Sequence, residues 1–160
     1  MEHLAICTDM KVYSYDELTA DDRALIEAAK AATATSYVPY SHFSVGAAAR
    51  LKDGTVVSGS NQENAAYPSG LCAERTTLFY ANAQYPNMPV ETLAVAARTE
   101  KDFIADPIPP CGACRQVMLE VENRYGQSMR VLLYGRDRIY EIEKAANLLP
   151  LSFNSASMED

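Results

Sequence analysis

Three cysteines in two short clusters have the residue types and the spacing of a metal centre. Cys72 stands alone, whereas Cys111 and Cys114 are three positions apart and follow a proline. Thiolates clustered in this way are typical zinc ligands, and three of them leave one tetrahedral position open. An open position is the mark of a catalytic zinc site, where water occupies the fourth corner. We therefore expect one Zn²⁺ per chain, held by these three residues.

A carboxylate accompanies the first cluster in the sequence Cys72-Ala73-Glu74. Two side chains this close point apart along a helix body, but at a helix tip both can converge on a point beyond the helix end. A glutamate at a helix start often serves only to complement the helix dipole. Beside an open zinc site, however, Glu74 is the natural general base. The pattern indicates a metal that activates water and a glutamate that moves the proton.

Two arginines, Arg75 and Arg115, directly follow the two cysteine clusters. Three thiolates on a divalent zinc sum to a charge of minus one, which weakens the pull of the metal on a bound water. We predict that one or both arginines donate to the thiolates and so restore the acidity of the metal. The alternative is that both are ordinary surface arginines.

No residue has the sequence spacing expected of a fourth protein ligand to the metal. His3 and His42 are the two histidines, and neither lies in a cysteine cluster. Cys7 shows no ligand spacing, although a fourth sulfur from this residue would close the site. A closed site would favour a function of a different class, a structural zinc module that mediates protein contacts.

Length, charge and composition limit the classes of function that the chain can have. A chain of 160 residues with a formal charge of −7 is long enough for one core, and we expect a single domain over residues 1–160. Its acidity argues against nucleic-acid and anionic lipid partners. No stretch is long and apolar enough to predict a membrane span or a secretory signal, so we expect a cytoplasmic protein.

The order of the expected helices and strands along the chain predicts an α/β fold. This fold is a three-layer α/β/α sandwich around a mixed sheet of roughly five strands. Residues 1–20 are expected to form an N-terminal extension with a short strand at 12–15, and residues 154–160 a loose acidic tail. The expected helices are 21–35, 72–85, 112–125 and a short one at 143–147, and the expected strands are 43–51, 55–59, 92–97, 129–134 and 138–142.

The chain as a whole resembles the small, homotetrameric cytidine deaminases. The cysteine and glutamate clusters match the signature of the zinc deaminases. The blocks that carry the resemblance from about Asp21 to Phe153 are 40–43 (YSHF), 61–65 (NQENA), 72–75 (CAER), 110–116 (PCGACRQ) and 148–153 (LLPLSF).

This resemblance implies roles for residues outside the metal motif. Asn61 and Glu63 match the pair that binds the ribose, and Phe43 matches the ring that lies against the pyrimidine. Ala73 lies within the matching CAER block, so the resemblance implies that it contacts the substrate. Phe153 matches a C-terminal phenylalanine that closes the pocket of a neighbouring subunit. The implied reaction is the hydrolytic deamination of the nucleosides cytidine and deoxycytidine, in pyrimidine salvage, by a homotetramer.

Two other deaminase functions compete with this interpretation. Enzymes that deaminate the nucleoside antibiotic blasticidin S are similar to this chain, but Arg75 favours the nucleoside branch. Deaminases that edit RNA or DNA usually have histidine as the first zinc ligand, where this chain has Cys72. The acidic charge also argues against a nucleic-acid substrate.

Overall fold

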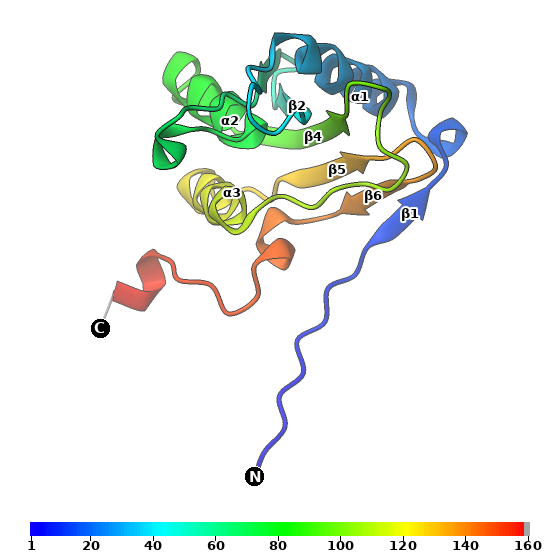
Figure 1. Cartoon of the computed structure of the whole chain (residues 1–160). Helices are drawn as coiled ribbons and strands as arrows, with labels where there is room; N and C mark the ends of the chain where they lie inside the picture. Colours follow the sequence, from blue (N-terminus) through cyan, green and yellow to red (C-terminus); the bar gives the residue numbers. More distant parts are fainter. Residues whose placement is uncertain (159–160) are drawn as a thin grey trace.

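A six-stranded mixed sheet forms the middle layer of the computed structural model, which describes residues 1–158 (Figure 1). Its strand order is β1-β6-β5-β4-β2-β3, and within the described residues only β4 and β5 run parallel. The strands are β1 (Lys11–Tyr13), β2 (Ser44–Leu51), β3 (Val56–Ser60), β4 (Val90–Arg98), β5 (Arg130–Tyr134) and β6 (Ile139–Ile142). The predicted mixed sheet is confirmed, with one strand more than expected because β1 adds a short edge strand beside β6.

Helices cover both faces of this sheet, as the predicted three layers require. The helix α1 (Ala20–Ala32) packs on one face, and α2 (Ala73–Gln84) and α3 (Gly112–Tyr125) pack on the other (Figure 1). Successive residues of a strand point to opposite faces, so Ala47 and Ala49 join the core under α2 and α3 while Ala48 joins the core under α1. The buried strand predicted at 92–97 alternates between the two cores in the same way.

The observed helix ends lie within three residues of those expected. The helix α1 ends at Ala32 and continues as a 3₁₀ turn (Thr33–Thr35), while α3 ends at Tyr125 and is capped by Gly126, which has a left-handed φ of 59°. The short helix expected at 143–147 is a 3₁₀ turn (Ala145–Leu148). The expected loose tail contains another 3₁₀ turn (Ser155–Met158), and its last two residues, 159 and 160, lie outside the described residues. No helix of the described chain combines the length and the apolar character that crossing a membrane demands.

Two glycines let the helices lie close to the sheet. A Cβ atom on Gly46 of β2 would stand 2.1 Å from the carbonyl oxygen of Ala29 in α1. On the other face, a Cβ atom on Gly59 of β3 would stand 2.9 Å from the hydroxyl of Thr77 in α2. The sheet is therefore clamped tightly between α1 and α2, which fixes the height of α2 and of its first turn above the strands.

A network of ion pairs connects α1 to the strands on which it packs. The carboxylate of Asp22, in the first turn of α1, is buried and accepts two hydrogen bonds from Arg130 of β5. Arg130 also donates to Glu141 of β6 at 3.0 Å, and Arg50 of β2 lies 3.5 Å from Asp22. Burial disfavours the charged form of Asp22, but Arg130 and Arg50 outweigh it, so its pKa lies below the ordinary value. The network ties α1 to three strands.

Replacement of Asp22 by asparagine should lower the free energy of unfolding at pH 7 by about 2 kcal/mol, because half-buried Arg130 loses one of its two charged partners. A carboxyl with a lowered folded pKa contributes stability that is full above the unfolded pKa of about 4 and is lost as the pH falls below it. Urea unfolding between pH 3 and 7 should show the difference from the parent shrinking in acid.

The matched control is Asp137→Asn, which removes a carboxylate from an exposed loop pair with Arg136. This variant should stay within about 0.5 kcal/mol of the parent, because exposed ion pairs contribute little. An equal loss of stability in both variants, or a difference for Asp22→Asn that does not change with pH, would contradict the proposed role of the network.

Candidate metal centre and substrate pocket

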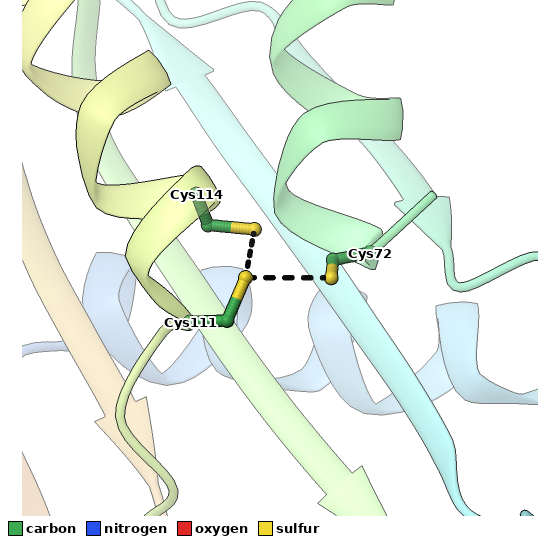
Figure 2. Close-up of side chains that lie close together, drawn as sticks. All are labelled: Cys72, Cys111 and Cys114. Atoms are coloured by element: carbon green, nitrogen blue, oxygen red, sulfur yellow. Dashed lines mark hydrogen bonds between the residues drawn. The ribbon is translucent and has the colours of Figure 1, made fainter. Parts of the chain in front are cut away.

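The three cysteines meet at the first turns of two neighbouring helices (Figure 2). Cys72 is the residue that caps α2, Cys111 caps α3, and Cys114 follows in the first turn of α3. The Sγ atoms of Cys72 and Cys111 are 3.7 Å apart, those of Cys111 and Cys114 are 3.4 Å apart, and all three lie within 4.8 Å of one another. Residues that are far apart in the sequence therefore form one sulfur cluster.

This cluster fits a zinc ion. With Zn–S bonds of about 2.3 Å in a tetrahedron, neighbouring sulfur atoms stand about 3.8 Å apart, which is close to the observed spacing. Cys7, the fourth cysteine, is exposed in the N-terminal segment and does not belong to the cluster. Within residues 1–158 no other cysteine, histidine or carboxylate joins the three sulfurs. The structure thus brings together the three sulfur atoms that the sequence predicts as zinc ligands.

The acidity of the thiols is strongly uneven across the cluster. The pKa of Cys72 is lowered to about 5, mainly by a hydrogen bond with the thiol of Cys114 and also by Arg75. The pKa of Cys114 is raised, because its thiol donates to Cys72 and because it is buried. One thiolate forms readily, whereas further ones would gather negative charge in a confined place. A divalent cation compensates that charge, which is the chemistry a zinc site needs.

Arg75 lies beside the first thiolate, whereas Arg115 does not point at the sulfurs. Nη2 of Arg75 lies 3.8 Å from Sγ of Cys72, and Nε of Arg75 is buried without a hydrogen-bond partner. Arg115 instead donates to the carbonyl oxygens of Pro110 (2.8 Å) and Leu148 (2.9 Å). Of the two arginines, Arg75 is placed to act on a metal ligand, and Arg115 braces the loop that precedes Cys111.

Glu74 is buried in the first turn of α2, with 4 % of its surface exposed. Burial raises its pKa above the ordinary value, and the neighbouring Cys72 thiolate adds to the shift. A carboxyl with a raised pKa is a stronger proton acceptor than an ordinary carboxylate, as a general base requires. Ala73, between Cys72 and Glu74, is fully buried, and its carbonyl oxygen accepts a hydrogen bond from Thr77.

A cavity of about 540 Å³ opens beside the sulfur cluster. Its lining includes Cys72 and Arg75 from the metal centre and Asn61 and Glu63 from the predicted sugar-binding pair. A volume of this size suits a small organic ligand. Phe43 is partly buried against the core under α2 and α3, and its carbonyl oxygen contacts Asn61.

Two tyrosines at this cavity escaped the reasoning from sequence. Tyr40 and Tyr67 line it and pack edge to face, with their ring centroids 6.0 Å apart. Both residues stand next to a proline in polar loops, and an exposed aromatic residue in such a loop is a signal for a binding surface. Phe153, by contrast, is exposed in the C-terminal segment, where its carbonyl oxygen accepts a hydrogen bond from Gln116.

Comparisons with known proteins agree with this geometry. The profile of the family described as "Cytidine and deoxycytidylate deaminase zinc-binding region" matches residues 19–125. The chain is 41 % identical to a cytidine deaminase of Halalkalibacterium halodurans over 140 residues, which cover 88 % of this chain and 99 % of the relative. It is 42 % identical to a cytidine deaminase of Sporosarcina psychrophila over 138 residues, or 86 % and 95 % of the two chains.

Solved structures are similar as well. The crystal structure of cytidine deaminase from Burkholderia pseudomallei superposes with a TM-score of 0.72 at 43 % identity and covers 85 % of this chain and 100 % of that one. Cytidine deaminase from Mycobacterium tuberculosis superposes with a TM-score of 0.66 at 32 % identity, covering 85 % and 99 %.

Together, the fold and the metal centre define the class of zinc-dependent hydrolytic deaminases. Within this class, the chain belongs to the cytidine and deoxycytidylate deaminase family. The resemblance seen in the sequence, the enzymatic class and zinc as the cofactor are thereby confirmed.

Replacement of Arg75 by glutamine should leave one zinc per chain but lower kcat by about ten- to a hundredfold, because a positive charge beside the Cys72 thiolate is lost. Zinc content measured by atomic emission, together with steady-state kinetics, tests both halves of this expectation. Arg136→Gln, on an exposed loop, is the control and should retain both properties. Unchanged turnover in Arg75→Gln would refute the role.

Proposed function

We propose that this chain converts cytidine and deoxycytidine to uridine and deoxyuridine, with water consumed and ammonia released. The observation that carries the proposal is the position of Glu74, which is buried in the first turn of α2, two residues after Cys72. The same metal ligand lines a cavity whose polar wall contains Asn61 and Glu63. A nucleoside needs both features, a reactive centre for its base and hydrogen-bonding groups for its sugar.

Zinc held by Cys72, Cys111 and Cys114 would supply an acidified water as the nucleophile near neutral pH. Glu74 accepts the proton that this water releases and delivers it to N3 of the cytosine ring as C4 is attacked. Glu74 then passes the second proton of the water to the amino group, which leaves as ammonia. The raised pKa of Glu74 suits it to hold a proton between these transfers.

The other site residues receive roles in binding. Asn61 and Glu63 hydrogen-bond the sugar, and the ring of Phe43 lies against the flat base. Arg75 offsets the charge of the thiolates. Ala73, which is fully buried between Cys72 and Glu74, is expected to contact the base.

Replacement of Glu74 by glutamine should lower kcat by about two to four orders of magnitude, because the amide cannot carry the proton. Zinc content and the affinity for uridine should remain close to the parent values, since the amide has nearly the same shape. The measurement is the loss of cytidine absorbance in the ultraviolet, with ammonia determined separately.

Glu120→Gln, on the exposed face of α3, serves as the control and should turn over cytidine like the parent. Substantial activity in Glu74→Gln would reject the assignment of this residue. A parent protein that binds zinc but leaves cytidine and deoxycytidine intact would reject the proposed function itself, and turnover of blasticidin S alone would support the competing interpretation.

We also propose a homotetramer that acts in cytoplasmic pyrimidine salvage, with each pocket completed by a neighbouring chain. Leu151 and Phe153 are largely exposed in the single chain, which is unusual for two large apolar side chains in one short segment. Burial of Phe153 at the pocket of a neighbour would account for that exposure. Light scattering should give four times the chain mass of 17.5 kDa, and the mass of a single chain would contradict the assembly.

A further inference from the structure

The segment 37–43, which leads into β2, is bound along its length by residues 61–63. The backbone N–H of Tyr37 donates to the carbonyl oxygen of Asn61 at 3.1 Å, and the N–H of Glu63 donates back to the carbonyl of Tyr37 at 2.8 Å. Backbone hydrogen bonds alone therefore hold the two stretches side by side. The shorter stretch carries Asn61 and Glu63, and the longer one ends at Phe43.

The side chain of Asn61 uses both ends of its amide on the backbone around Phe43. Its Nδ2 donates to the carbonyl oxygen of Phe43 at 2.9 Å, and its Oδ1 accepts from the N–H of Val45 at 2.9 Å. An amide is the one neutral side chain that offers a donor and an acceptor in this fixed geometry. Asn61 thus continues the pairing of β2 beyond the end of the strand and fixes the backbone on both sides of Ser44.

Glu63 holds the other end of the same turn. Its Oε2 accepts from the backbone N–H groups of Tyr40 (3.0 Å) and Ser41 (3.2 Å), and these bonds leave Oε1 for a ligand. The next residue, His42, has a left-handed φ of 54°, which costs energy for a residue with a side chain. The turn is therefore held in a conformation that its own backbone does not favour.

We propose that Asn61 and Glu63 are positioning residues for Phe43. They fix the turn on both sides of His42, and so set the place of the Phe43 ring before a substrate enters the cavity. This inference rests on the proposed function, in which Phe43 contacts the base, and it adds a second task to two residues otherwise assigned to the sugar. Contact with the sugar alone would leave the turn unchanged in the ligand-free protein.

Hydrogen exchange of the ligand-free, zinc-loaded protein separates the two roles. In Asn61→Ala and in Glu63→Ala, exchange across residues 37–45 should become about tenfold faster, as the loss of two hydrogen bonds implies. Glu63→Gln keeps an oxygen that can accept from Tyr40 and Ser41, so exchange in this variant should stay near the parent rate. Asn123→Ala, which removes an exposed amide on α3, is the control and should change nothing in this segment.

Kinetics in a double-mutant cycle test whether the effect reaches Phe43. Asn61→Ala should raise KM for cytidine about tenfold in the parent but much less in a Phe43→Ala background, because the ring to be positioned is absent. Should Asn61→Ala unfold, Asn61→Asp keeps the acceptor for Val45, loses the donor for Phe43, and serves in the same cycle. Thermal unfolding and zinc content establish that each variant is intact.

Unchanged exchange across 37–45 in both alanine variants, with KM effects that add in the cycle, would overturn the inference and leave a sugar contact only. The exchange measurement needs no substrate, so it remains decisive even if the parent fails to deaminate cytidine. That failure would reject the proposed function, whereas the faster exchange would still establish the two residues as supports of the turn.

Discussion

The convergence of three sulfur atoms from two helix starts is the constraint on which the site depends. Cys72 caps α2 and Cys111 caps α3, so the two helices must begin at the same place on one face of the sheet. Free backbone N–H groups and the positive helix ends favour thiolates there. Helix packing therefore serves the metal directly: any tilt of α2 relative to α3 changes the spacing of the ligands.

The sequence predicted the layers and the metal ligands because both leave local signals. Alternation in the strands and turn residues between them identify the elements, and Cys111 and Cys114 share a helix face by spacing alone. The short edge strand β1 was not counted because three residues carry little periodicity, and its pairing with β6 joins segments about 130 residues apart. Helix ends shifted by up to three residues because Thr33–Thr35 continue α1 as a tighter turn.

Contacts between distant side chains had no such signal. Arg75 and Arg115 both lie within four residues after a cysteine, yet of the two only Arg75 approaches a sulfur atom. Arg115 donates instead to the carbonyl oxygens of Pro110 and Leu148. The hydrogen bonds between the Asn61 side chain and the backbone of Phe43 and Val45 could not be predicted either, since they follow from the path of a turn and not from residue type. Sequence therefore indicated candidate residues for the site, and tertiary structure decided what each one touches.

The hydrogen bonds of Arg115 and Gln116 also link the metal centre to residues 148–153. Arg115 donates to the carbonyl oxygen of Leu148 and Gln116 donates to that of Phe153, so the first turns of α3 and this segment hold each other in place. The same part of α3 carries Cys114, and Arg115 also donates to Pro110, directly before Cys111. A displacement of residues 148–153 would therefore be transmitted mechanically to two of the three sulfur atoms.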